Sequence, residues 1–294
     1  MNILVTGAGG QLGRSLREAS RNSSDKYFFA DIVELPDTYH LDITSSEEVD
    51  SFVRANSIGV IVNCAAFTNV DGAEDNEPLA DLLNGTAPGI LARCMKEVGG
   101  TLFHISTDYV FGKEQYNTPC PEDRTGTPSG AYGRTKLHGE QEIISSGCDY
   151  LIIRTAWLYS EWGRNFLLTM RRLTAEREAL DVVFDQVGTP TYAMDLAEAI
   201  FSIVEERKYL GRGGIYNYTN EGVCSWYDFA LCIAELSGNP SCKVRPCHSS
   251  QFPSKVQRPS YSVLDKTRIK DVFEVEIPHW TTSLRKCINN LQNQ

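Results

Sequence analysis

Two tyrosine–lysine pairs in the sequence have a spacing suited to acid–base chemistry on a carbonyl group. Tyr132 is followed four residues later by Lys136, and Tyr109 by Lys113. Within a helix, side chains four residues apart project from one face, so the ammonium lies beside the phenol. The ordinary pKa of tyrosine is about 10, and a nearby ammonium brings the phenol closer to the working range of a general acid. Such a pair suits ketone reduction, in which a hydride donor attacks the carbonyl carbon while an acid protonates the oxygen.

The surroundings of the two pairs differ. Tyr132 follows a loop rich in proline and glycine and enters a stretch of good helix formers that includes Lys136. Tyr109 directly follows an apolar run, and Gly112 lies inside its spacing, so Lys113 need not share its face. We therefore expect Tyr132 to be the acid, and Lys136 to tune it and to hold the ribose of a nicotinamide cofactor.

Two hydroxyl residues, Ser106 and Thr107, end the apolar run that begins at residue 101. Reduction of a ketone usually uses a third group that orients the carbonyl oxygen. These two hydroxyls lie at the end of the predicted strand, at the carboxyl edge of the sheet. The alternative is that they only end a strand by bonding its own backbone.

The glycines Gly7, Gly10 and Gly13 follow a G-x-x-G-x-x-G pattern between an apolar run at 2–6 and a helix-like stretch at 11–20. Glycine allows a tight turn, and it lets backbone N–H groups approach a pyrophosphate at a helix N-terminus. An ordinary glycine-rich loop is the alternative, but a strand before the loop and a helix after it favour a dinucleotide site.

Two acidic residues follow at positions where the adenosine end of a dinucleotide would lie. Asp31 ends the apolar run at 27–31, 18 residues after Gly13, where a carboxylate can accept hydrogen bonds from ribose hydroxyls. It would also repel a 2′-phosphate, which favours NADH, although Asp31 could equally be a solvated strand end. Asp42 and Ile43 could line the adenine pocket, or Asp42 could only satisfy a turn.

Apolar runs alternate with helix-like stretches through the first half of the chain. We expect strands at 2–6, 27–31, 60–63, 101–106 and 150–154, and helices at 11–20 and from about 132 onward. A further helix would run toward Ala55, opened by a capping box of Thr44 with Glu47. This order predicts an α/β Rossmann-type doubly wound parallel sheet with a smaller C-terminal substrate-binding lobe. The dinucleotide-binding domain would span 1–155, with 192–218 returning to it, and the lobe 156–191 and 219–294.

The composition excludes several other classes of protein. The net charge is −10 and there is no basic stripe, which argues against nucleic-acid binding. No apolar run reaches the length of a membrane span, and no signal peptide begins the chain, so we expect a cytoplasmic protein that does not bind membranes. Nine cysteines without C-x-x-C pairs favour reduced thiols, and five histidines without ligand spacing predict no metal site.

Taken together, these segments resemble the extended short-chain dehydrogenase/reductases, and among them the dTDP-4-dehydrorhamnose reductases. The resemblance spans nearly the whole chain. It is carried by Met1-Asn2-Ile3-Leu4-Val5-Thr6-Gly7 with Gly10-Gln11-Leu12-Gly13, by Val62-Asn63-Cys64-Ala65-Ala66-Phe67-Thr68-Asn69-Val70-Asp71, by Ser106-Thr107-Asp108-Tyr109-Val110-Phe111, by Tyr132-Gly133-Arg134-Thr135-Lys136, by Arg154-Thr155-Ala156-Trp157-Leu158-Tyr159, and by Asp185-Gln186-Val187-Gly188-Thr189-Pro190-Thr191.

The resemblance implies NADPH- or NADH-dependent reduction of the C4 keto group of dTDP-4-dehydro-L-rhamnose to dTDP-L-rhamnose. Thr107, Tyr132 and Lys136 would form the catalytic triad. Thr107, Asp108, Trp157 and Arg258 would face the nucleotide sugar. Besides Tyr132 and Lys136, the cofactor contacts would be Gly7, Gly10, Gln11, Leu12, Gly13, Asp31, Asp42, Ile43, Ala65, Ala66, Phe67 and Thr68. The chain departs from the family at Cys64, where alanine is usual, and at Phe67, where a more polar residue is usual, which bears on nicotinamide binding.

Other readings of the resemblance remain. A 4,6-dehydratase or an epimerase of the same superfamily shares the glycine loop and the Tyr/Lys pair, but the dehydratases carry Asp-Glu after the threonine, where this chain has Asp108 and Tyr109. The regulatory subunit of methionine adenosyltransferase shares the fold without catalysing this chemistry. The sequence leaves open the choice of nicotinamide, any divalent-ion requirement, and the oligomeric state, for which a homodimer is one option.

Overall fold

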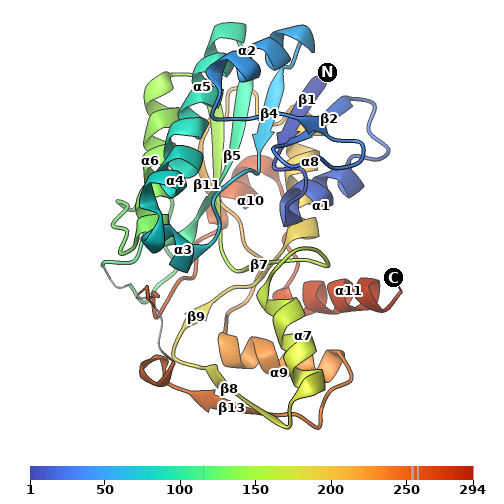
Figure 1. The fold of residues 1–294 in the computed structure, drawn as a ribbon, viewed down its shortest axis with the longest axis vertical. Coiled ribbons are helices and arrows are strands. Elements are labelled where there is room, and N and C mark those ends of the chain that lie inside the picture. The colour runs from blue at the N-terminus through green and yellow to red at the C-terminus, as the bar shows by residue number, and fades with distance from the viewer. Residues whose placement is uncertain (115, 253–254, 257, 294) are drawn as a thin grey trace.

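The computed structural model describes residues 1–114, 116–252, 255–256 and 258–293 (Figure 1). Its main feature is a seven-stranded sheet in the order β11-β6-β5-β4-β1-β2-β3, with every neighbouring pair parallel. The predicted Rossmann-type sheet is thereby confirmed. The strands are β1 (Asn2–Thr6), β2 (Lys26–Asp31), β3 (Tyr39–His40), β4 (Val60–Asn63), β5 (Thr101–Thr107), β6 (Asp149–Thr155) and β11 (Gly214–Asn217).

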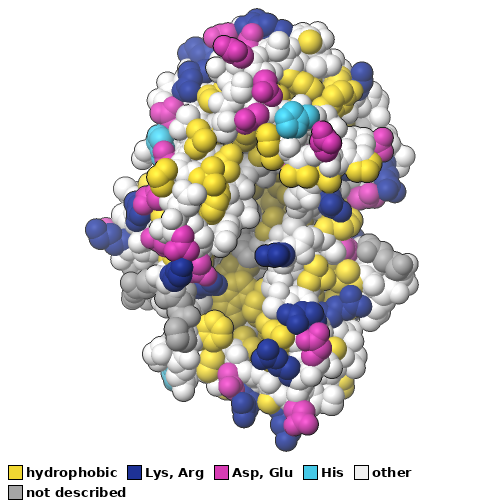
Figure 2. All heavy atoms as spheres, viewed as in Figure 1, with side chains coloured by type: hydrophobic (Ala, Val, Ile, Leu, Met, Phe, Trp, Pro, Cys, Tyr) yellow, Lys and Arg dark blue, Asp and Glu magenta, His cyan; other side chains and the backbone are white. Residues whose placement is uncertain are grey.

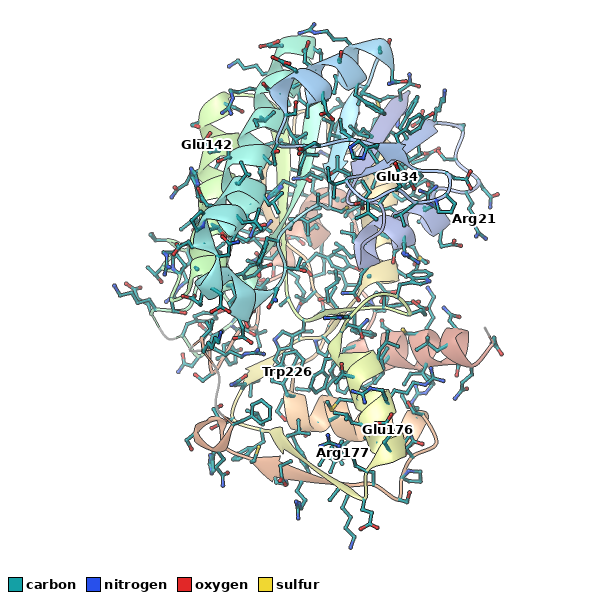
Figure 3. All side chains as sticks on the ribbon, viewed as in Figure 1. Arg21, Glu34, Glu142, Glu176, Arg177 and Trp226 are labelled. Carbon is teal, nitrogen blue, oxygen red and sulfur yellow. The ribbon has the colours of Figure 1, made fainter. Side chains whose placement is uncertain are left out.

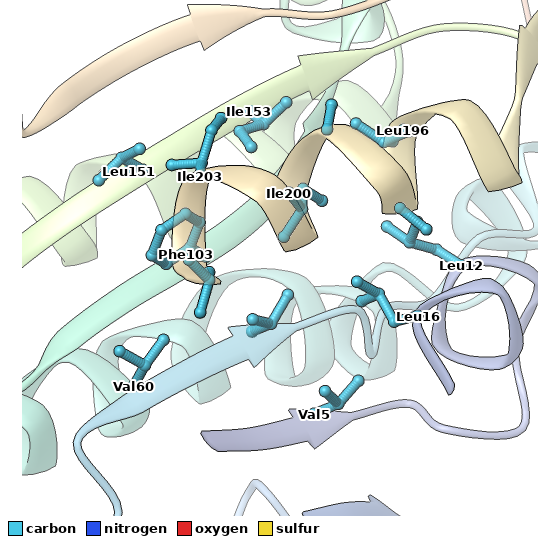
Figure 4. Packing of buried hydrophobic residues seen from close by; sticks show 14 of the residues in the cluster. Val5, Leu12, Leu16, Val60, Phe103, Leu151, Ile153, Leu196, Ile200 and Ile203 are labelled. Atoms are coloured by element: carbon cyan, nitrogen blue, oxygen red, sulfur yellow. The ribbon is translucent and has the colours of Figure 1, made fainter. Parts of the chain in front are cut away.

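Alternating side chains of these strands pack against helices on both faces of the sheet. Ile3 and Val5 of β1 belong to the core under α1 (Gln11–Ala19), α8 (Ala193–Glu205) and α10 (Thr267–Phe273), part of which Figure 4 shows. Leu4, between them, belongs to the opposite core, under α2 (Ser46–Ala55), α5 (Ala87–Val98) and α6 (Ala131–Ser146). Two-sided burial explains why the strands are continuous apolar runs.

The strand order reverses beside β1. The chain passes from β1 to β2 and β3 on one side, then crosses to β4, β5 and β6 on the other. Ligands of open α/β sheets bind in the crevice that such a reversal opens at the carboxyl ends of the strands. Segments after β4 and β5 cover this end: α3 (Val70–Asp75), α4 (Glu77–Asp81), the π-helical turn Leu82–Thr86 and the 3₁₀ turn Asp108–Val110.

A second apolar core lies below the sheet in Figure 1. It is built around α7 (Phe166–Glu176), α9 (Trp226–Leu236) and α11 (Trp280–Gln292), with the parallel pair β8 (Ala179–Val183) and β13 (Lys243–Cys247). The short pairs β7 (Leu158–Tyr159) with β10 (Thr191–Tyr192), and β9 (Val187–Gly188) with β12 (Cys224–Ser225), connect it to the sheet. Helix α10, although late in the chain, packs in the core of the sheet instead.

Local signals explain several element ends, and one prediction is corrected. The N-cap of α2 is Ser45, whose hydroxyl accepts from the backbone N–H of Glu48, so the predicted box of Thr44 with Glu47 is wrong by one residue. Thr44 is instead held by Asp42, which accepts hydrogen bonds from its backbone N–H and its hydroxyl.

None of the described helices combines the length and apolar character needed to cross a bilayer. The same described residues contain no group of three or more His, Cys, Asp or Glu placed to share a metal ion.

Candidate active site

A cavity of about 920 Å³ opens at the carboxyl ends of the strands. In Figure 2 the front face is hollowed between the upper and lower parts of the molecule, and hydrophobic side chains line the hollow. The cavity brings together most of the predicted site residues, from seven separate segments of the chain: Gly7, Gly10, Gln11, Leu12, Asp31, Asp42, Ile43, Ala65, Ala66, Thr68, Thr107, Asp108, Tyr132, Lys136 and Trp157.

The glycine loop forms one wall of this cavity. Gly7 has φ 65°, and a Cβ there would lie 2.6 Å from the backbone nitrogen of Ala65, so only glycine fits. Gly10 caps α1 and donates its N–H to the Gly7 carbonyl at 3.0 Å. The helix N-terminus thus faces the cavity, where its free N–H groups and its dipole favour an anion.

Two carboxylates hold the loops at the end of the cavity beside β2. Asp31 accepts hydrogen bonds from the backbone N–H of Gly9 at 2.9 Å and of Val33 at 3.1 Å. Asp42 accepts from the backbone N–H and the hydroxyl of Thr44, at 2.9 and 2.7 Å. Asp42 therefore does satisfy a turn while also lining the cavity, and Asp31 ties the glycine loop to the end of β2.

Tyr132 and Lys136 lie one turn apart on α6, and both line the cavity. Lys136 is only 1% exposed; its Nζ donates to the Ile105 carbonyl at 2.7 Å and lies 3.2 Å from Nε2 of His104. Burial lowers the pKa of Lys136 to about 8, the charge of Glu140 opposing this change. Burial raises the pKa of Tyr132 to about 12, so the expectation that Lys136 brings this phenol closer to neutrality is not met, and the group that lowers the pKa is the Thr107 hydroxyl. The phenol keeps its proton at neutral pH.

Thr107 and Asp108 continue from the end of β5 into the same cavity. The Thr107 hydroxyl donates to Asp108 Oδ1 at 3.0 Å, and its interaction with Tyr132 offsets part of the rise in the pKa of that phenol. Asp108 is 2% exposed, and burial raises its pKa to about 7. A hydroxyl, a phenol and a carboxyl whose pKa is raised by burial therefore line the same cavity as Lys136.

The structure separates the two tyrosine–lysine pairs. Tyr109 lies in the 3₁₀ turn after β5, and its ring meets that of Tyr132 edge to face, with centroids 5.5 Å apart. Lys113 is exposed and is not among the residues that line the cavity. Tyr132 with Lys136 is thus the pair whose two members both face the cavity.

Trp157 forms the floor of the cavity on the side of the second core. It has φ 50°, an uncommon conformation for a large residue, and its indole stacks on Trp226 with centroids 3.5 Å apart and an interplanar angle of 9°. Trp226, labelled in Figure 3, is the first residue of α9 in the lower part of the molecule. The stack places a broad apolar face where α9 meets the loop after β6.

Three predicted residues lie outside the cavity lining. Gly13 packs behind the loop, where a Cβ would lie 2.3 Å from the Gly7 carbonyl oxygen. Phe67 exchanges backbone hydrogen bonds with the Asn84 side chain, at 2.8 and 3.0 Å. Arg258 is exposed and lies 3.7 Å from the carboxylate of Asp71.

Several residues that line the cavity carry no separate signal in the sequence. Arg164 follows Gly163 in the loop that leads to α7, and an isolated arginine there reads as surface charge. Apolar residues reach the cavity from the π-helical turn and from the neighbouring loops, and such residues are indistinguishable from core: Ile32, Leu41, Val70, Leu79, Leu82, Leu83 and Ile105.

Comparisons with known proteins agree with this geometry. The family model described as "RmlD substrate binding domain" matches residues 1–293. The chain belongs to this family. A dTDP-4-dehydrorhamnose reductase of Mycolicibacterium smegmatis is 40% identical to this RmlD-family chain over 287 residues, which cover 97% of this chain and 84% of the relative.

Two solved structures superpose on almost the full length of the chain. A dTDP-4-dehydrorhamnose reductase of Clostridium acetobutylicum has a TM-score of 0.91 at 38% identity, covering 99% of this chain and 100% of its own. One from Bacillus anthracis, solved in complex with NADP, has a TM-score of 0.89 at 34% identity, covering 98% and 99%. The resemblance read from the sequence motifs is therefore confirmed at the level of the family.

Proposed function

We propose that the protein is a nicotinamide-dependent reductase that converts dTDP-4-dehydro-L-rhamnose to dTDP-L-rhamnose. The observation that carries the proposal is the placement of Tyr132, Lys136 and Thr107 in one cavity with the glycine loop. The family match and the names of the relatives supply the substrate, which the cavity alone does not identify.

The residues present fit a dinucleotide. A Cβ at Gly7 would fill the space beside Ala65, and the N-terminus of α1 faces the same space. When bound, NADH or NADPH supplies the hydride. The residues that would hold it are Gly7, Gly10, Gln11, Leu12, Asp31, Asp42, Ile43, Ala65, Ala66, Thr68, Tyr132 and Lys136, all of which line the cavity. Gly13 and Phe67 would contribute indirectly, by supporting the loops whose other residues line the cavity.

Each side chain then has a separate role in the reaction at C4 of the sugar. Tyr132, a protonated phenol at neutral pH, gives its proton to the C4 oxygen. The ammonium of Lys136 stabilises the phenolate that forms, and it holds that charge at pH values below about 8. The Thr107 hydroxyl orients the carbonyl, while Asp108 and the face of Trp157 bind the sugar. Arg258 would reach the diphosphate only by leaving Asp71.

A coupled assay of nicotinamide oxidation tests the proposal. Purified protein with dTDP-4-dehydro-L-rhamnose should oxidise NADH or NADPH, with one product formed per cofactor consumed, and should leave dTDP-glucose unchanged. Dehydration of dTDP-glucose would favour a 4,6-dehydratase instead. A protein that binds cofactor yet is inert toward the keto sugar would favour a regulatory subunit. We place the reaction in the cytoplasm, where nucleotide sugars and reduced nicotinamides are available.

A further inference from the structure

A line of buried polar side chains runs behind Lys136, across three neighbouring strands. Thr6, Asn63 and His104 are partners in register on β1, β4 and β5. The Thr6 hydroxyl donates to Asn63 Oδ1 at 2.6 Å, Asn63 Nδ2 lies 3.0 Å from His104 Nδ1, and His104 Nε2 lies 3.2 Å from Lys136 Nζ. None of the roles proposed above uses Asn63 or His104.

A backbone group fixes the orientation of the Asn63 amide. The N–H of Ala65 points at Asn63 Oδ1, at 3.2 Å, and a backbone N–H can only donate. Rotating the Asn63 amide by half a turn would place its NH₂ group against the N–H of Ala65, so that two donors would face each other. The oxygen of Asn63 therefore faces Thr6 and Ala65, and its NH₂ group faces His104.

The amide in turn fixes the proton on His104. The NH₂ group of Asn63 has no lone pair to offer, so His104 Nδ1 accepts from it. His104 is 0% exposed, and burial, with a further contribution from the charge of Lys136, keeps its pKa well below the ordinary value. A neutral imidazole whose Nδ1 accepts must carry its single proton on Nε2, the nitrogen that faces Lys136.

The two forms of Lys136 meet this N–H differently. An ammonium has three donors and no acceptor, whereas a neutral amine has a lone pair that can accept from His104 Nε2–H. The bond to the Ile105 carbonyl is open to either form. The other titratable groups facing Lys136 are Glu140 on α6 and the thiol of Cys64, which burial keeps neutral.

Glu140 does not cancel the stabilisation of the neutral amine by His104, because the charge of Glu140 is already compensated. Arg154 donates to both Glu140 oxygens, at 2.9 and 2.6 Å, and the Ser106 hydroxyl donates to one of them at 2.5 Å. Among the described groups around Lys136, His104 is thus the one whose hydrogen bond to the lysine can form only when the lysine is a neutral amine.

We propose that His104, held in one tautomer by Asn63, is a positioning residue that stabilises the neutral amine form of Lys136 and so sets the pH range over which the lysine is charged. The proposal rests on the function proposed above, in which the ammonium of Lys136 is needed for proton transfer by Tyr132. The consequence is an enzyme whose activity declines at a lower pH than a lysine with an ordinary pKa near 10.4 would give.

The tautomer can be observed without any substrate. Long-range ¹H–¹⁵N correlation spectra of the ¹⁵N-histidine-labelled protein distinguish Nε2–H from Nδ1–H imidazole, and the His104 signal is the one missing from His104→Gln. We expect the Nε2–H tautomer across the neutral range. An Nδ1–H tautomer or an imidazolium in the wild-type protein would overturn the proposal.

Two variants test the effect on the lysine. In Asn63→Asp the carboxylate can only accept, so it should switch His104 to the Nδ1–H tautomer and present an acceptor to Lys136. His104→Gln offers the ammonium an amide oxygen without adding charge, which separates the tautomer effect from the charge of an aspartate. The ¹³Cε titration of Lys136 should move from about 8 toward the ordinary lysine value in both variants. His138→Gln, on the same helix but partly exposed and paired with Asp81, is the matched control and should change nothing.

The pH profile gives the functional readout. In both variants, the fall of kcat/KM at high pH should begin at a higher pH than in the wild-type protein. This shift should match the shift in the midpoint of the Lys136 titration followed by NMR. An unchanged high-pH fall and midpoint in both variants, with activity lowered equally at every pH, would mean a merely structural role and would overturn the proposal. If the protein shows both NMR results but reduces no keto sugar, the proposed function fails while the influence of His104 on Lys136 stands.

Discussion

Replacing Asp31 by asparagine should shift the choice of nicotinamide cofactor toward NADPH. Asp31 lines the cavity at the end of β2, where the adenosine ribose is expected, and its carboxylate is tied to the backbone of Gly9 and Val33. Asparagine has the same shape and keeps one acceptor oxygen. The change therefore removes a negative charge from the cavity and also costs one of the two backbone hydrogen bonds, because Gly9 and Val33 donate to different oxygens of Asp31.

The size of the effect follows from Coulomb's law. A 2′-phosphate carries a charge of roughly −2 at neutral pH. At about 5 Å from a carboxylate, the repulsion is about 1.7 kcal/mol with the dielectric constant of water and about 3 kcal/mol with half that value. Since about 1.4 kcal/mol corresponds to tenfold in affinity, Asp31→Asn should raise the affinity for NADPH relative to NADH by roughly 10- to 100-fold.

The assay is the ratio of kcat/KM for the two cofactors, with dissociation constants from fluorescence quenching as a check. Glu34→Gln is the matched control, because it removes the same charge from an exposed position on the next loop, outside the cavity lining. The wild-type protein should prefer NADH, and added salt should reduce that preference. A cofactor ratio that stays within twofold in Asp31→Asn, or that Glu34→Gln changes equally, would refute the reasoning.

Three further predictions concern the loop, the core and the pH range. Gly13→Ala sets a Cβ 2.3 Å from the Gly7 carbonyl oxygen, so cofactor affinity should fall at least tenfold and stability by about 1–3 kcal/mol; wild-type binding in a titration would contradict this. Arg154→Met leaves Glu140 buried without its partner and should cost about 3–5 kcal/mol in urea unfolding, and adding Glu140→Leu should recover most of that loss. Because the pKa of Lys136 is about 8, its charge is present below that pH and lost above it, so kcat/KM should fall about tenfold per pH unit above 8. A profile that stays flat to pH 10 would remove the lysine charge from the mechanism.

The elements that position the site were predictable from the sequence because their signals are local. Strands buried on both faces must be apolar throughout, as β4 is, and the glycine spacing between β1 and α1 follows from the close approach of the loop to Ala65. The helix carrying Tyr132 and Lys136 was predictable from helix formers after a proline- and glycine-rich loop. The prediction for the start of α2 was wrong by one residue, since Thr44 and Ser45 are both good caps and the local hydrogen bonds of Thr44 to Asp42 decide between them.

The parts that sequence reasoning missed depend on contacts between distant segments. A histidine inside an apolar run reads as a core residue, and the role argued for His104 becomes visible only once β4 sets Asn63 against it. The stack of Trp157 on Trp226 joins the loop after β6 to the start of α9, and no periodicity links the two residues. Arg164 gives no signal until the loop before α7 and the glycine loop border the same cavity.

The most direct test of the proposed chemistry is the turnover of Tyr132→Phe. The substitution removes one hydroxyl from the cavity and leaves the ring packed against Tyr109. We predict that kcat for reduction of the keto sugar falls by roughly 100- to 10,000-fold, as for the loss of a general acid, while the dissociation constant for NADH changes little. Turnover close to that of the wild-type protein would contradict the assignment of Tyr132 as the acid.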